Sequence, residues 1–158
     1  MDDPRYRKDL DKVYYSEVFG EVLFGTAARW TRTSSDQRMK WLKLQELETQ
    51  TKERFLAFLH AAGQHAHLSM TAKPLGRVCG VLLGTLPWTV AMRLLEKGTR
   101  FYLALFERLE QEANNDNKAF FAYVTAHERA IAEFARRESR GQKGNSLLPV
   151  TKLLQGRY

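Results

Sequence analysis

Four long stretches of the chain repeat apolar residues at alternating spacings of three and four, which is the period of an amphipathic helix. None of the four prolines interrupts these stretches. The pattern predicts an all-α fold whose long helices span residues 6–31, 36–62, 87–113 and 117–139. Two shorter helices are expected, one within the connection 64–86 and one near the C-terminus.

Local signals support the predicted helix ends. We expect Asp36 to cap the second long helix and Gly63 to end it. Pro87 suits the first turn of the third helix, and the polar run Asn114-Asn-Asp-Asn117 separates the third helix from the fourth. One long connection among short ones is typical of an antiparallel four-helix bundle with a crossover between its second and third helices.

Three of the apolar stripes carry polar side chains at their centres. A carboxylate buried between helices is costly unless it is paired, hydrogen-bonded or bound to a metal, so these positions are candidates for a functional site. The third long helix brings no carboxylate to its stripe, although Glu96 lies beside it. The central polar residues are Glu17, Glu21, Glu48, Thr51 and His127.

Two four-residue windows each match half of a Glu-x-x-His metal-ligand motif. Glu48-Thr-Gln-Thr51 has the glutamate without the histidine, and Val124-Thr-Ala-His127 has the histidine without the glutamate. The spacing of three places both ligand positions on one face of a helix. Glu17 precedes the first window by about thirty residues. In this arrangement the chain resembles the ferritin-like superfamily, and within it rubrerythrin-like proteins and the demethoxyubiquinone hydroxylase family.

The resemblance covers roughly residues 6–140 and implies a ferritin-like bundle with an iron site. A complete family site takes one glutamate from each of two helices and a Glu-x-x-His from each of the other two. Glu17, Glu48 and His127 match by position, whereas Thr51 and Val124 depart from the pattern. Glu21 and Glu96 are additional candidate ligands. The implied function is a non-haem iron oxidoreductase or an iron-binding protein, and two ions, one or none remain open.

The residues also allow a metal-free interpretation. A protonated His127 between Glu17 and Glu48 would satisfy these groups directly. Supporting hydroxyl groups would then hydrogen-bond the remaining oxygens. The candidates for that role are Tyr14, Thr51, Tyr102 and Tyr123. In this alternative the chain is a binding or interaction protein that retains the bundle without the metal cluster.

The segment 75–92 is apolar, but it is too short and too interrupted to span a bilayer. One interpretation is a crossover helix packed on the bundle. The family resemblance instead implies peripheral membrane contact or an apolar small-molecule ligand in this region. A homodimer formed through a face of the bundle is also plausible.

Composition narrows the partners and the compartment. The net charge is +7, but basic and acidic residues alternate along the helices, so we expect no nucleic-acid partner. Cys79 is the single cysteine, and the N-terminal residues do not resemble a signal peptide. We therefore expect a cytoplasmic protein, with peripheral membrane contact as the open alternative, and a single domain spanning residues 1–158.

Overall fold

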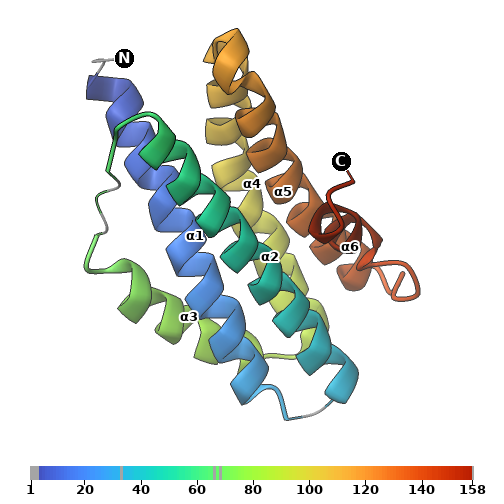
Figure 1. Ribbon diagram of the computed structural model, residues 1–158. Coiled ribbons are helices and arrows are strands. Elements are labelled where there is room, and N and C mark those ends of the chain that lie inside the picture. Colours follow the sequence, from blue (N-terminus) through green and yellow to red (C-terminus); the bar gives the residue numbers. More distant parts are fainter. Residues whose placement is uncertain (1–3, 33, 66, 68, 158) are drawn as a thin grey trace.

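The computed structural model describes residues 4–32, 34–65, 67 and 69–157, so the chain ends and residues 66 and 68 of the predicted connection lie outside the described residues. This part of the chain forms six helices and no strand, which confirms the all-α fold class (Figure 1). The helices are α1 (Pro4–Trp30), α2 (Ser35–Ala61), α3 (Ala72–Thr85), α4 (Trp88–Glu112), α5 (Asn115–Ser139) and α6 (Leu148–Leu154).

The start of α2 differs from the sequence prediction. Ser34, and not Asp36, is the N-cap, and its hydroxyl accepts a hydrogen bond from the Gln37 backbone N–H at 3.3 Å. Asp36 lies inside the first turn, where its carboxylate pairs with Lys40 at 2.7 Å. The helix begins earlier because Ser34 adopts the extended backbone that an N-cap needs. At the other end Gly63 has a φ of 65°, as expected for a glycine that follows a helix.

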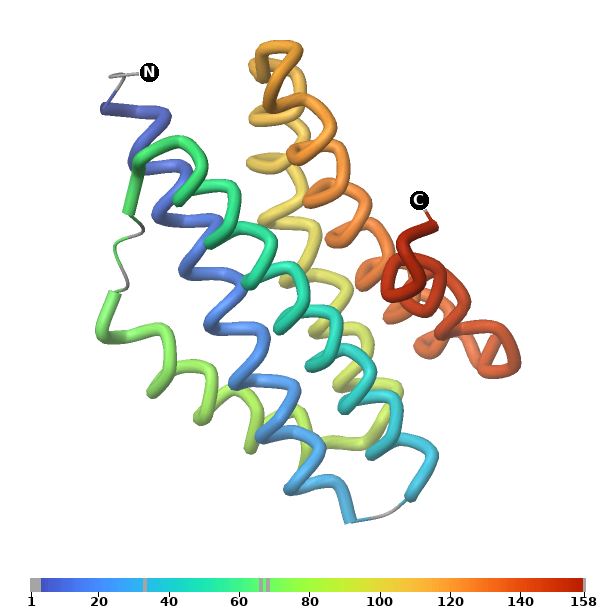
Figure 2. Tube along the Cα trace, viewed as in Figure 1, coloured from blue at the N-terminus to red at the C-terminus, as the bar shows by residue number. Residues whose placement is uncertain are grey.

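The long helices pack mainly in two pairs, α1 against α2 and α4 against α5. Within each pair the chain reverses direction through a short connection (Figure 2). The small helix α6 contacts both α5 and α2. The buried side chains of all six helices form one hydrophobic cluster, in which Trp41, Phe55, Phe106, Phe121 and Phe134 are among the largest members.

Helix α3 lies against α1 through a stripe of glycines (Figure 1). Gly76, Gly80 and Gly84 recur every fourth residue, so they share one face of α3. A Cβ atom added at Gly80 would lie 2.5 Å from the Leu23 carbonyl oxygen of α1, and one at Gly84 would lie 2.6 Å from that of Ala27. Only glycine allows this approach of the two backbones, which brings α3 into the wall of the site described below.

Among the described residues, every helix falls short of the length and apolar character needed to cross a membrane. Helix α3 is apolar, but it has 14 residues, and a membrane-spanning helix needs about 20.

Candidate metal centre

Glu17 of α1, Glu48 of α2 and His127 of α5 meet inside the protein. One ligand atom from each residue lies within 4.8 Å of the other two, and all three residues are buried. Among the described residues they are the one such group of three or more potential metal ligands. The local reason is the stripe pattern, since each residue occupies the centre of an apolar helix face and is carried into the core with its neighbours.

While both acids are ionised, the three side chains face one another without forming hydrogen bonds, whereas a proton on either acid would join the Glu17 and Glu48 carboxyl groups by a hydrogen bond. Nδ1 of His127 lies 3.5 Å from Oε2 of Glu17, and Nε2 lies 3.7 Å from Oε1 of Glu48. Both distances exceed the usual hydrogen-bond range. Both carboxylate oxygens of Glu17 and both ring nitrogens of His127 lack a hydrogen-bond partner among the described residues. Each buried polar atom without a hydrogen-bond partner lowers the stability of the folded protein by about 1–3 kcal/mol.

Burial is the dominant electrostatic influence on this cluster. It raises the pKa of Glu17 well above the usual value, an effect that His127 opposes and that the neighbouring Glu48 carboxylate reinforces. Burial also raises the pKa of Glu48, with a further contribution from Glu128. The cluster therefore disfavours several negative charges at once, and a cation placed among these groups would relieve that cost.

Gly20 makes room for the Glu48 carboxylate. A Cβ atom added at this position of α1 would lie 2.5 Å from Cδ of Glu48, which is closer than real Cβ contacts come. The glycine stands one turn after Glu17 on the same helix. The absence of a side chain at Gly20 thus lets the carboxylate of α2 approach α1 beside the Glu17 carboxylate.

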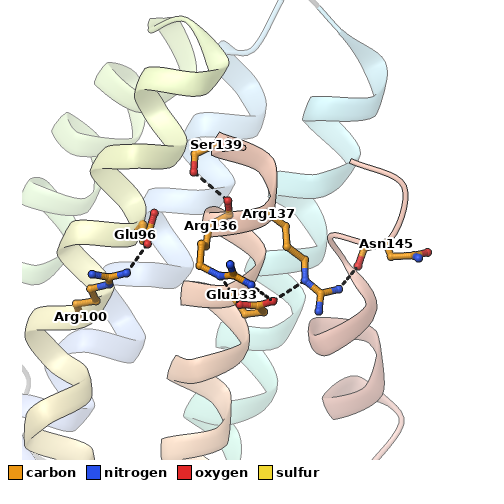
Figure 3. Close-up of polar contacts among 7 residues, drawn as sticks. All are labelled: Glu96, Arg100, Glu133, Arg136, Arg137, Ser139 and Asn145. Atoms are coloured by element: carbon orange, nitrogen blue, oxygen red, sulfur yellow. Dashed lines mark hydrogen bonds and ion pairs between the residues drawn. The ribbon is translucent and has the colours of Figure 1, made fainter. Parts of the chain in front are cut away.

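Two of the predicted ligands lie outside the cluster. Glu21 accepts a hydrogen bond from Thr49 at 2.7 Å and pairs with Lys52, and both of these residues belong to α2. Glu96 pairs with Arg100 one turn further along α4, at 2.6 Å (Figure 3). Each carboxylate lies on a partly exposed helix face, where it pairs with a neighbouring cation, so the structure does not bring Glu21 or Glu96 to the cluster.

Figure 3 also shows the hydrogen bonds that a second surface carboxylate, that of Glu133, accepts. Glu133 of α5 accepts hydrogen bonds from Arg136 at 2.7 Å and from Arg137 at 2.6 Å. The hydrogen bond from Arg136 contributes most to lowering the pKa of Glu133 to about 2. This surface network is the opposite of the core cluster, because each of its acids has guanidinium donors in reach.

None of the four residues expected to support the cluster has a hydrogen bond to it among the described contacts. Thr51 and Tyr123 hydrogen-bond each other at 3.0 Å. The ring of Tyr14 stacks on Phe55 with centroids 6.0 Å apart. Tyr102 lines a cavity beside the cluster. The Thr51 hydroxyl, three residues after Glu48, is therefore engaged by Tyr123 of α5.

Glu128 is a third acid of the site, which the sequence interpretation missed. It is buried on α5 directly after His127, and burial raises its pKa to about 8 against the opposing effect of His127. A signal was present: Val124, Glu128, Ile131 and Ala135 follow the spacing of four, three and four, so Glu128 belongs to a second apolar stripe on this helix. All four residues are buried.

A cavity of about 410 Å³ leads to the cluster from the surface. Its walls come from α1, α3, α4 and α5, and its lining includes the carboxyl groups of Glu48 and Glu128. Most of the remaining lining is aliphatic or aromatic. The buried acids are therefore within reach of a small molecule that enters between these helices.

Comparison with known proteins adds no relative to this picture: no protein-family model, no curated protein and no solved structure matches the chain.

Proposed function

We propose that this chain is a ferritin-like bundle protein that binds one metal ion, in the first place iron, with Glu17, Glu48 and His127. The observation that carries the proposal is the set of buried, converging donor atoms that lack hydrogen-bond partners among the described residues. Nearly all buried polar groups in proteins are hydrogen-bonded. Buried donor atoms without a hydrogen-bond partner therefore favour a bound ligand at this position.

The geometry and the charge of the cluster fit a divalent cation. Donor atoms bound to one ion at about 2.1 Å lie at most about 4.2 Å apart. The present separations, up to 4.8 Å, need an inward movement of a few tenths of an ångström. Two carboxylates would neutralise the two charges of the ion, and imidazole is a common ligand of iron. Three protein ligands leave coordination positions for water or substrate.

One ion is favoured over two because half of the family pattern is replaced. Thr51 is hydrogen-bonded to Tyr123, and Val124 supplies an apolar side chain in place of a glutamate. Bound iron would supply redox chemistry, and the cavity that reaches Glu48 would admit the molecule on which it acts. An oxidoreductase is therefore the enzymatic form of this proposal.

The test is an anaerobic titration of the metal-free protein with Fe²⁺. We expect one ion per chain, and Glu48→Ala should weaken binding at least 100-fold because a ligand is lost. Glu21→Ala and Glu96→Ala are matched controls that should bind as the wild type does, since both acids pair elsewhere. Equal binding by the wild type and the Glu48 variant would contradict the proposal, as would a wild type that binds no iron.

A second candidate is a metal-free protein that binds an apolar ligand or a membrane surface through the region 75–92. It is favoured by the apolar cavity, whose lining includes the exposed side chain of Leu82, and by two further exposed apolar side chains of α3, those of Leu75 and Val78. Stoichiometric iron in the purified protein together with oxygen consumption would exclude this candidate. A cytoplasmic location, a homodimer and the lack of a nucleic-acid partner are further parts of the proposal that this experiment does not address.

A further inference from the structure

The cavity beside the cluster has an outer and an inner end. Its outer rim contains Leu82 of α3, Leu94 of α4 and Phe101 of α4, which are 52%, 46% and 79% exposed. Its inner end contains Glu48 and Glu128, which are 5% and 6% exposed. A molecule entering from solvent thus passes an apolar rim before it reaches two acids.

Few polar side chains of the cavity are free to recognise a ligand. The hydroxyl of Ser16 donates to the Val13 carbonyl at 2.7 Å, and that of Thr99 donates to the Leu95 carbonyl at 2.9 Å, so both serve their own helices. The carboxyl group of Glu128 has no hydrogen bond or ion pair in the described part of the chain and adjoins the open space. Its oxygen atoms are acceptors that an entering molecule would meet at the inner end, beside the Glu48 carboxyl group, and Tyr102 adds a hydroxyl group to the lining.

We propose that this cavity binds an elongated apolar molecule whose inner end is an alcohol or an amine that donates a hydrogen bond to Glu128. The apolar walls select an apolar body, and the buried acceptor selects a donor at its end. A ligand with a carboxylate end is excluded, because the described residues that line the cavity offer no cation to offset the desolvation of an anion at its inner end. This inference deepens the ligand-binding part of the proposed function, and it rests on the cavity alone, whether or not metal is bound.

The size of the cavity sets the length of the ligand. Small-molecule sites in proteins occupy about 300–1,000 Å³, and 410 Å³ lies near the lower end of that range. A single ring with a short alkyl chain is of the right order. Three matched probes share such a body: 4-butylbenzyl alcohol, 4-butylbenzylamine and 4-butylbenzoic acid.

Cys79 provides a local readout of binding. It is the only cysteine of the chain, it is partly buried, and it lines the cavity. The experiment measures the rate at which iodoacetamide alkylates Cys79 in intact, chelator-treated protein, with increasing amounts of each probe. We expect the alcohol or the amine to slow alkylation at least tenfold at saturation, and the acid to have no effect at the same concentration. Equal protection by the acid would overturn the proposal.

Two substitutions at Glu128 identify the contact. Glu128→Leu removes the acceptor and should lower the affinity of the protecting probe at least tenfold. Glu128→Gln keeps a neutral acceptor, so an alcohol should still bind, whereas an amine that relies on the negative charge should weaken as it does with leucine. Unchanged protection in the leucine variant would overturn the assignment of Glu128. Because the protein is free of metal throughout, a failure of iron binding leaves these results unaffected.

Gly98 of α4 tests the location. It lines the cavity, and a Cβ atom added there meets no atom within 4 Å, so larger residues fit without strain. Gly98→Phe should abolish protection by filling the space, whereas Gly98→Ala should retain it. Both variants should fold, since glycine is the weaker helix former. Each rate is compared with that of the same variant without probe, and equal binding by the two variants would place the ligand elsewhere and refute the proposal.

Discussion

The core holds two kinds of buried carboxylate. Glu138 of α5 is 1% exposed, yet both of its oxygens have partners. Oε1 lies 2.9 Å from the Lys40 ammonium and accepts from the Ser146 hydroxyl, and Oε2 accepts from the Trp88 indole N–H at 2.6 Å. Glu17 is equally buried, but both of its oxygens lack a hydrogen-bond partner among the described residues. One acid has three donors from three segments, and the other faces a second acid and a histidine.

The contrast shows that this fold is able to satisfy a buried carboxylate. Two of the partners of Glu138, Lys40 and Ser146, are themselves buried. The cluster of Glu17, Glu48 and His127 receives no comparable donor in the described part of the chain. Polar groups at functional sites often remain unsatisfied until a ligand binds, whereas structural ones are satisfied by the protein. We therefore interpret the Glu138 network as structural and the cluster as functional.

The largest expected effect comes from breaking the structural network. Lys40→Met leaves the Glu138 carboxylate buried without its cation, which costs about 3–5 kcal/mol when one partner of a buried pair is removed. We expect a loss of this size in the free energy of unfolding, measured by urea denaturation. Lys43→Met is the matched control, because Lys43 and its partner Glu46 are 40% and 54% exposed and such pairs contribute less than about 1 kcal/mol. Similar losses of unfolding free energy in Lys40→Met and Lys43→Met would contradict a structural role for the Glu138 network.

The opposite result is expected at the functional cluster. Glu17→Met replaces a buried acid by an apolar side chain of similar length, which should stabilise the metal-free protein by about 1–3 kcal/mol. The same variant should lose metal binding. Glu138→Met is the matched control and should destabilise, since it leaves the Trp88 indole N–H and the Ser146 hydroxyl without their acceptor and Lys40 with Asp36 as its remaining partner. A stability loss with Glu17→Met would indicate that this acid is held by an internal network instead.

The stability of the metal-free protein should fall as the pH rises. Burial raises the pKa values of Glu17 and Glu48 well above the usual range and that of Glu128 to about 8. Between the usual glutamate pKa and about 8 the folded state therefore binds more protons than the unfolded state. Linkage then lowers the free energy of unfolding across this window. Thermal melts from pH 5 to 8 should show a decline that is smaller in Glu128→Gln.

Added metal should reverse that trend, because it binds the ionised carboxylates and displaces their protons. The melting temperature of the metal-loaded protein should therefore exceed that of the metal-free protein by an amount that grows with pH. A metal-free protein whose stability rises over the same window would contradict the buried, uncompensated state of these acids.

The smallest effect is expected from crowding the Glu48 carboxylate. Gly20→Ala puts a methyl group where that carboxylate lies and should weaken metal binding about tenfold, or ~1.4 kcal/mol. Gly25→Ala is a close control on the same helix, since its Cβ atom would lie 2.5 Å from the side-chain nitrogen of Gln45, outside the cluster. Isothermal titration of both variants with metal measures the difference. Equal affinities would show that the Glu48 carboxylate need not occupy its present position.

The sequence predicted the helical fold because the apolar period persists over about fifteen residues or more in each long helix, a signal that local irregularities do not hide. It also singled out Glu17, Glu48 and His127, which lie at the centres of those stripes and are brought together in the structure. The start of α2 was predicted less well, since Ser34 and Asp36 are both good capping residues and only the backbone conformation distinguishes them.

The remainder of the site depends on side-chain directions that the sequence does not specify. Glu21 lies four residues after Glu17 and shares its stripe, yet it turns toward Lys52. Glu128 follows His127 directly, so an apolar stripe that contains His127 leaves Glu128 on another face of the helix. Glu128 is nevertheless buried, because α5 packs against other helices on more than one side. Which neighbour each long side chain meets is decided by helix packing, and that packing is not encoded in any one helix.

The most direct test of the central claim is anomalous X-ray scattering at the iron edge from crystals of the iron-loaded protein. We expect one peak per chain, within about 2.0–2.3 Å of a carboxylate oxygen of Glu17, a carboxylate oxygen of Glu48 and a ring nitrogen of His127. No peak among these residues, with His127 instead within hydrogen-bond distance of both carboxylates, would contradict the account and establish the cluster as a metal-free network.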